Sequence, residues 1–214
     1  MESEGILNEL SRDSKHSLFY SISKKHFSNL NRLKNKLKDF YAKLEIIEKQ
    51  VEEQETEELC KQEYKMLKRI DVLEKKIEFE AISSIIFSAL FLEAYIYDYG
   101  ARRLGDNFIK EHIDKLDPMS KIVVITQLVL EKPFPKDRDI YGRLKSLIKS
   151  RNSLVHNKSH KIDLSKFKNY IEKRDVELIE LIKEGLDAYE TIYDFLQFML
   201  EIDSNESFQI NLLI

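Results

Sequence analysis

The residues best suited to chemistry lie within six positions, where Arg151, Asn152 and His156 occur in the run RNSLVH. An imidazole can take up or release a proton near pH 7. A neighbouring amide can orient the ring, and a guanidinium can bind an anion. These residue types at this spacing indicate proton transfer beside a bound anionic group.

Arg151 stands out because it interrupts an apolar stripe. At 100° per residue, the predicted helix 137–154 has one apolar side, and Arg151 lies near its middle, with Asn152 at its edge and His156 one turn further on. The stripe consists of Ile140, Leu144, Leu147, Ile148, Leu154 and Val155. A buried arginine is costly without a partner. The alternative to a functional role is therefore a structural arginine, bonded to a carboxylate such as Glu93.

The charge around this helix differs from that of the whole chain, whose formal net charge is −3. Only Asp163 opposes eight basic residues between positions 143 and 168, namely Arg143, Lys145, Lys149, Arg151, Lys158, Lys161, Lys166 and Lys168. A local basic patch predicts phosphate binding, with RNA contacts expected at Lys145, Lys149, Lys158 and Lys161. The alternative is a solvated helix face.

The run from Arg151 to His156 resembles the R-N-x-x-x-H motif of the HEPN ribonucleases. Residues 88–96, SALFLEAYI, resemble the first core helix of that superfamily. Residues 121–134 and 144–150 resemble the connection into its motif helix. The resemblance covers about residues 80–200, and residues 1–79 have no counterpart.

This resemblance implies a metal-independent endoribonuclease, often a toxin of a toxin–antitoxin pair or an anti-phage defence effector. It implies that His156 acts as base or acid, that Arg151 binds the scissile phosphate, and that Asn152 orients His156 or contacts the phosphate. Glu93 and Ser153 would position these residues, and the products would carry 2′,3′-cyclic phosphate and 5′-hydroxyl ends. No cofactor is expected. The expected partners are RNA (tRNA included), a second copy of the chain and an antitoxin or defence protein, but no membrane.

The elements that position the motif are all expected to be helices. Leu30, Leu33, Leu37, Phe40, Leu44, Ile47 and Val51 alternate three and four residues apart, which predicts a coiled-coil-like seam. We expect a hairpin with arms 27–53 and 58–80, the second arm continuing into a buried helix 81–100. Further helices are predicted at 106–116 (capped by Asp106), 118–130, 137–154 and 176–200, with 208–214 as a strand or a packed tail.

The expected fold class is thus all-α: an N-terminal arm and long helical hairpin in residues 1–79, followed by a HEPN-like helical bundle in residues 80–214. The chain has 214 residues, of which 43% are hydrophobic, with 3 prolines and 5 glycines. A single cysteine, Cys60, and a start unlike a signal peptide predict a cytoplasmic protein. The apolar run 81–99 is interrupted by Glu93 and Asp98, so we expect a core helix rather than a membrane span.

A rival function also fits the sequence. A catalytically silent helical module would act through the hairpin at 30–77, docking a partner by its seam or its acidic tip. The hairpin is equally compatible with a stabilising or dimerisation arm. Other enzyme classes have less support, because the chain has no G-x-S-x-G turn and no glycine-rich phosphate loop. His156 and His160 lack further ligands for a zinc site.

Overall fold

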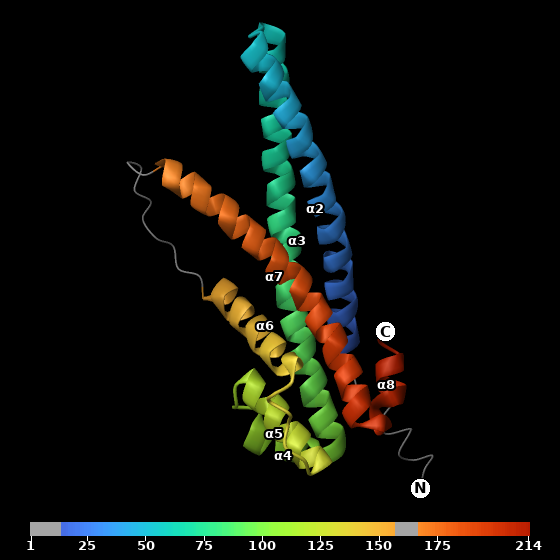
Figure 1. Cartoon of the computed structure of the whole chain (residues 1–214). Coiled ribbons are helices and arrows are strands. Elements are labelled where there is room, and N and C mark those ends of the chain that lie inside the picture. The colour runs from blue at the N-terminus through green and yellow to red at the C-terminus, as the bar shows by residue number, and fades with distance from the viewer. Residues whose placement is uncertain (1–13, 157–166) are drawn as a thin grey trace. The chain divides into compact units, whose positions relative to one another are not determined.

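The computed structural model describes residues 14–156 and 167–214, and every regular element in these ranges is helical (Figure 1). This confirms the predicted all-α class. The elements in chain order are α2 (His16–Glu53), α3 (Glu57–Leu104), α4 (Asp106–Phe108), the π-helical η1 (Ile109–Ile113), α5 (Pro118–Leu130), α6 (Asp139–Val155), α7 (Phe167–Ile202), the 3-10 helix η3 (Ser204–Glu206) and α8 (Ser207–Asn211).

The chain forms two compact units, and each contains segments that are distant in sequence. We name the first the motif unit, whose described residues are 14–23, 85–156 and 187–214. The described residues of the second, the hairpin unit, are 24–84 and 167–186. Helices α2, α3 and α7 therefore contribute residues to both units, whereas the predicted domains, 1–79 and 80–214, were each continuous in sequence.

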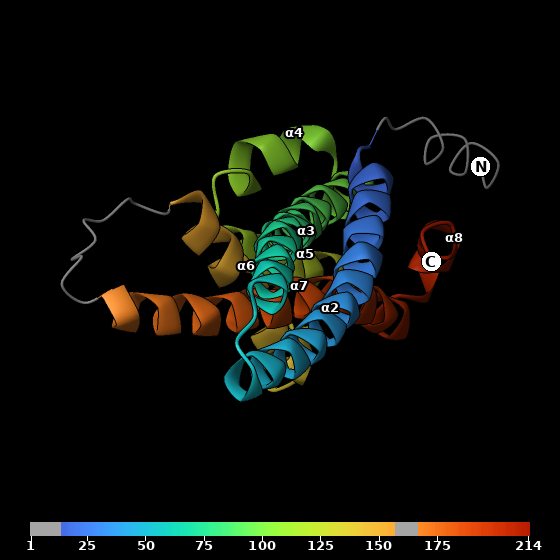
Figure 2. The ribbon, with the colours of Figure 1, turned by 90° about the horizontal axis from the view of Figure 1, so that it is seen from above.

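In the hairpin unit, α2 and α3 lie side by side along a leucine-rich seam (Figures 1 and 2). The buried positions of α2 are Leu30, Leu37 and Leu44, which are seven residues apart, as the heptad pattern predicts. They pack with Ile70, Leu73, Ile77 and Ala81 of α3 and Ile182 of α7. The predicted hairpin is confirmed, and its second arm continues without a break into the apolar part of α3. Its first arm is longer than expected, because α2 begins at His16 and not at residue 27.

Helix α7 approaches the hairpin closely at Gly185. A Cβ atom at this position would lie 2.8 Å from the Ala81 Cα atom and 2.8 Å from a methyl carbon of Leu30. The Ser84 hydroxyl donates a hydrogen bond to the Gly185 carbonyl oxygen at 2.6 Å. Only a residue without a side chain allows the two backbones to pack at this distance.

The core of the motif unit is built around the second half of α3. Its fully buried side chains include Ile85, Phe91, Tyr95 and Tyr99. One stretch of α3 is long and apolar enough to cross a membrane, but 56% of that stretch is buried, a pattern shared by core helices of soluble proteins. The core surrounds α3 with side chains from α5, α6 and α7, among them Ile122, Leu144 and Phe195.

The predicted helix ends hold in some places and fail in others. Helix α5 begins at Pro118 as expected, and Asp117 caps it, since its carboxylate accepts the backbone N–H groups of Met119 and Ser120, both at 3.1 Å. The predicted cap Asp106 is wrong: Gly105, at φ 90°, occupies the cap position of α4 and no side chain caps it. Residues 106–116 form a short α-helix and a π turn, where we expected one α-helix.

The C-terminal region contains more helix than the sequence predicts. Helix α7 begins at Phe167, earlier than the predicted 176, and the tail forms α8 with Ile210 buried. Residues 173–177 are all exposed, so no apolar periodicity marks this part of the helix. It is rich in helix-forming charged residues, and Lys173 pairs with Glu177 one turn away at 3.2 Å.

Candidate functional site

Helix α6 carries the predicted site within the motif unit. Ile140, Leu144, Leu147 and Ile148 are buried, which fixes the side of α6 that faces the core. The helix ends at Val155, and His156 follows as its C-cap, with its backbone N–H bonded to the Asn152 carbonyl at 3.0 Å. The apolar stripe predicted from the sequence is thus confirmed over the first three turns. Val155, however, is 57% exposed, because the last turn of α6 extends beyond the core.

One solvent-facing side of α6 holds four of the predicted site residues. Lys145, Lys149, Asn152 and His156 are all exposed and are separated by four, three and four positions. At 100° and 1.5 Å per residue, they share an arc of about 60° and extend over about 16 Å of the helix. We call this set the α6 row. No carboxylate within the described residues forms an ion pair with either lysine.

Arg151 lies beside the α6 row and not in it. Its Nη2 atom donates to Glu93 Oε1 of α3 at 3.0 Å, and its Nη1 atom donates to Asn152 Oδ1 at 2.9 Å. The side chains of Arg151 and Glu93 are 26% and 29% exposed, so the pair is accessible to solvent. The pairing of Arg151 with Glu93, which the sequence offered as the alternative to a functional role, is therefore present in the structure. The same pair also places a guanidinium next to the exposed residues of α6.

The remaining predicted residues contribute less. Ser153 is exposed on α6 and lies about 40° outside the arc of the α6 row. Lys158 and Lys161, predicted to bind RNA, lie outside the described residues, as does His160. Of the other basic residues in the predicted patch, Arg143 forms an ion pair with Asp194 of α7. Among the described residues, the exposed cations nearest in sequence to the motif are therefore Lys145 and Lys149, with Arg151 partly available.

The arrangement offers acid–base and anion-binding groups. His156 is exposed at a helix end, where a substrate can reach its imidazole. Arg151 has five N–H donors, of which two are used in the contacts with Glu93 and Asn152. The others can donate to an incoming phosphate. In the part of the chain that the structure describes, no cluster of three His, Cys, Asp or Glu side chains is arranged to hold a metal ion.

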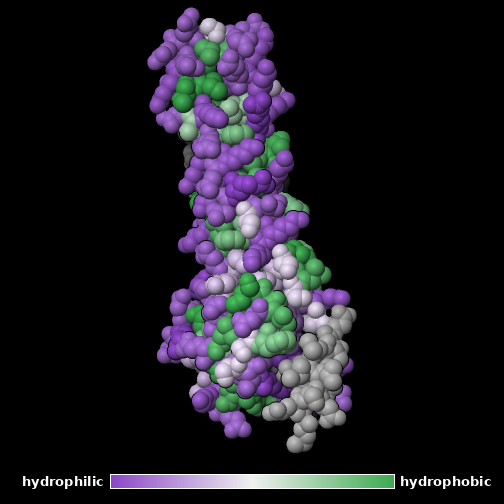
Figure 3. All heavy atoms as spheres, turned by 90° about the vertical axis from the view of Figure 1, so that its right-hand side faces the viewer, coloured by the Kyte–Doolittle hydropathy of each residue, from purple (hydrophilic) through white to green (hydrophobic). Residues whose placement is uncertain are grey.

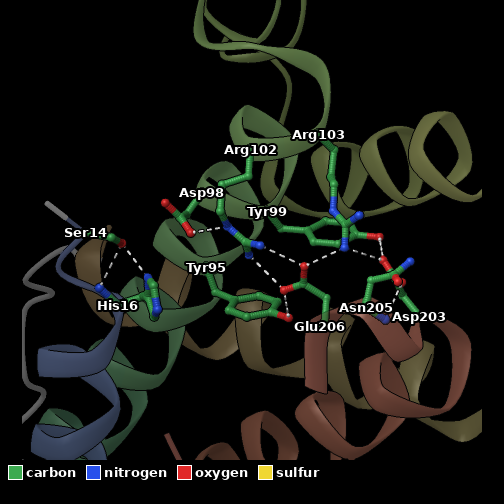
Figure 4. Close-up of polar contacts among 10 residues, drawn as sticks. All are labelled: Ser14, His16, Tyr95, Asp98, Tyr99, Arg102, Arg103, Asp203, Asn205 and Glu206. Atoms are coloured by element: carbon green, nitrogen blue, oxygen red, sulfur yellow. Dashed lines mark hydrogen bonds and ion pairs between the residues drawn. The ribbon is translucent and has the colours of Figure 1, made fainter. Parts of the chain in front are cut away.

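A second polar cluster in the motif unit was not predicted (Figure 4). The fully buried Glu206 carboxylate accepts from both terminal nitrogens of Arg102 at 2.8 Å, from Arg103 at 3.1 Å and from the Tyr95 hydroxyl at 3.3 Å. Arg102 also donates to Asp98 at 2.9 Å. We call this the Glu206 cluster.

The Glu206 cluster joins the C-terminal segment to α3. Asp203 extends it by accepting from the Tyr99 hydroxyl at 2.9 Å and from Arg103 at 3.3 Å. Burial raises the pKa of the Tyr95 and Tyr99 hydroxyls, and the nearby carboxylates raise them further. The one sequence signal was local: Asp98 and Arg102 stand four residues apart at the end of an apolar helix. Because its members are protonated or paired and buried, we interpret the cluster as structural.

The comparisons with known proteins provide no further assignment. No family model, no curated protein and no solved structure matches this chain. The geometry of α6 and the resemblance of the run from Arg151 to His156 to the R-N-x-x-x-H motif are therefore the observations that bear on function.

Proposed function

We propose that this protein is a metal-independent endoribonuclease of the HEPN type, with Arg151, Asn152 and His156 as its catalytic residues. One observation supports this most strongly. The α6 row presents Lys145, Lys149, Asn152 and His156 on one exposed side, and Glu93 holds Arg151 next to it. A row of cations that ends at an imidazole and a guanidinium suits a phosphodiester backbone.

In the proposed reaction, His156 removes the proton from a ribose 2′-hydroxyl group. The 2′-oxygen then attacks the adjacent phosphorus atom, and the bond from phosphorus to the 5′-oxygen breaks. The leaving 5′-oxygen takes a proton from an imidazolium, either this His156 or that of a second copy. The products are a 2′,3′-cyclic phosphate and a 5′-hydroxyl, and no metal ion takes part.

Arg151 and Asn152 support this step in different ways. The free N–H groups of Arg151 bind the phosphate oxygens and stabilise the charge that develops on them. Glu93 limits the orientations of the guanidinium, which reduces the entropy lost when the substrate binds. Asn152, bonded to Arg151 through its Oδ1 atom, links Arg151 to the α6 row. Lys145 and Lys149 bind phosphates further along the RNA.

The proposal includes the setting in which the enzyme acts. The substrate is RNA, with tRNA as one candidate, and the active form is a homodimer in the cytoplasm. An antitoxin or another defence-system protein would restrain it, as in toxin–antitoxin and anti-phage systems.

The rival function, a silent interaction module, is favoured by a different observation. Tyr64 and Phe79 of α3 in the hairpin unit are 59% and 62% exposed, so large apolar side chains remain uncovered there. Such side chains are typical of protein-binding surfaces. This function leaves the accessible His156 and its neighbours without a role.

The test uses purified protein incubated with total cellular RNA in the presence of EDTA. Three proteins are compared: the unaltered chain, His156→Ala, and the matched control His112→Ala, whose imidazole is exposed on η1 in the same unit. We expect cleavage by the unaltered chain and by His112→Ala, but not by His156→Ala. Equal cleavage by all three, or none by any, would favour the interaction module.

A further inference from the structure

The first arm of the hairpin carries a strong local positive charge. Between positions 24 and 43, α2 contains seven basic residues and one acidic residue, Asp39, although the chain as a whole is negative. The seven are Lys24, Lys25, Arg32, Lys34, Lys36, Lys38 and Lys43. In the second arm, by contrast, residues 57–80 contain six basic and seven acidic residues. The positive charge is therefore a property of α2 and not of the hairpin in general.

Four of these residues share one side of the helix. Lys25, Arg32, Lys36 and Lys43 are separated by seven, four and seven positions, and all are exposed. At 100° and 1.5 Å per residue they fall within an arc of about 40° and span about 27 Å. This side, which we call the α2 basic face, lies about 120° around the helix from the buried Leu30, Leu37 and Leu44. Hydrophilic side chains cover most of the surface that α2 presents in Figure 3.

The cations of the α2 basic face have no carboxylate partners among the described residues. Lys36 lies over the Phe40 ring at 5.3 Å, a contact that leaves its charge uncompensated. In the other arm, Lys61 and Lys75 pair with Glu57 and Asp71, each one turn earlier, at 2.5 and 2.7 Å. Like charges one turn apart, such as Arg32 and Lys36, slightly destabilise a helix. A bound polyanion would remove that cost.

We infer that the α2 basic face binds the phosphate backbone of single-stranded RNA. A single strand carries one negative charge per nucleotide, so a strand that runs along this face, about 27 Å long, can bring several phosphates to its four cations. The exposed Asn35 amide on the adjoining side of α2 can donate to phosphate or sugar oxygens. The inference deepens the proposed function and rests on it for the choice of RNA as the ligand.

A membrane surface fits this face less well than a nucleic acid does. A helix that lies on a membrane inserts its apolar side between the lipids. The apolar side of α2 is already occupied, since Leu30, Leu37 and Leu44 pack against α3 and α7. Between positions 24 and 43, Tyr41 is the exposed large apolar residue, and its hydroxyl donates to Glu74 at 2.5 Å. The side of α2 that stays exposed to solvent is polar and positively charged, which suits a nucleic acid.

The experiment measures binding by fluorescence anisotropy with a labelled single-stranded RNA of about 16 nucleotides. All proteins carry His156→Ala, so that the RNA stays intact. The face variant combines Lys25→Gln, Arg32→Gln, Lys36→Gln and Lys43→Gln. Glutamine has nearly the helix propensity of lysine and arginine, so the helix is preserved. The matched control makes the same number of changes on exposed positions of α3: Lys61→Gln, Lys65→Gln, Lys68→Gln and Lys76→Gln.

The expected result is a change in salt dependence. Each phosphate contact contributes about 0.7 to the slope of log K against log salt for a single strand, so four lost contacts reduce the slope by about 2.8. Raising the salt from about 50 mM to about 200 mM should then weaken the parent about fifty times more than the face variant. The α3 control should behave as the parent does. Asp39→Asn, which removes the one acidic residue of this segment, should tighten binding.

Equal affinities and equal salt slopes for the parent and the face variant would overturn the inference. So would binding by the parent to vesicles of anionic lipid but not to the RNA. Cleavage is measured separately, with His156 intact. If the unaltered chain cuts RNA but the face variant binds RNA as tightly as the parent, the inference about α2 is wrong and the proposed function stands. If RNA binding depends on the face but nothing is cut, the proposed function fails and the binding surface stands.

Discussion

The replacement Glu206→Gln tests how much the Glu206 cluster contributes to the motif unit. The carboxylate is fully buried, and the Arg102 side chain beside it is only 4% exposed. The change keeps the size of the side chain but removes its charge, and it turns an amide N–H₂ toward guanidinium donors. Arg102 keeps Asp98 as a partner at 2.9 Å, so it does not become fully unpaired. Breaking a buried pair from one side costs about 3–5 kcal/mol, and we therefore expect a loss near 3 kcal/mol.

Thermal and urea unfolding, followed by circular dichroism, measure this loss. For a chain of this size each kcal/mol lowers Tm by about 2–4 °C, so the expected shift is about 6–12 °C. The near-ultraviolet signal should report the same transition, because Tyr95 and Tyr99 are part of the cluster. The matched control is Glu201→Gln, which breaks an exposed pair with Arg138 and should change Tm little. Similar shifts for both variants would refute the assignment of a stabilising role to the buried cluster.

Three further predictions concern pH, packing and the site. Burial lowers the pKa of His16 below 6.5 in the folded state. The free energy of unfolding should therefore be full above pH 6.5 and should fall below that pH, because the unfolded chain then gains a proton. His16→Gln should reduce that fall in urea titrations between about pH 7 and pH 5. Gly185→Ala should destabilise the fold, since overpacking costs about 1–3 kcal/mol. Gly142→Ala, whose new methyl group meets open space beside α6, should stabilise the fold by up to about 1 kcal/mol. Tm shifts of the same sign for both variants would contradict this. Glu93→Gln should lower stability by less than about 1 kcal/mol, because its pair with Arg151 is partly exposed, yet slow RNA cleavage; unchanged cleavage would show that Glu93 does not position Arg151.

The parts of the fold that follow local rules were predictable from the sequence. The leucines at positions 30, 37 and 44 repeat every seven residues and are buried as that repeat requires. The pair Asp117–Pro118 predicted the start of α5, because the fixed φ angle of proline suits the first turn of a helix. In each case the pattern and its cause lie within a few residues of each other.

The features that the sequence missed depend on contacts between distant segments. Glu206 meets Arg102 across 104 positions, and no periodicity links a buried carboxylate near the C-terminus to the end of α3. Val155 continues the apolar stripe of α6 by spacing, but the core does not extend to the last turn, so it is exposed. The helical wheel located Arg151 on the apolar side, and Glu93 was among its expected partners. The wheel alone did not show that both side chains remain accessible to solvent.

In the proposed reaction, His156 removes the proton of a ribose 2′-hydroxyl during RNA cleavage. The most direct measurement follows cleavage of one synthetic RNA in EDTA by the unaltered chain and by His156→Ala, with the product ends identified by mass spectrometry. We expect 2′,3′-cyclic phosphate and 5′-hydroxyl ends from the unaltered chain, no cleavage by the variant, and no cleavage when the riboses are replaced by 2′-deoxyriboses. Cleavage by the variant at the same rate, or of the deoxyribose substrate, would contradict it.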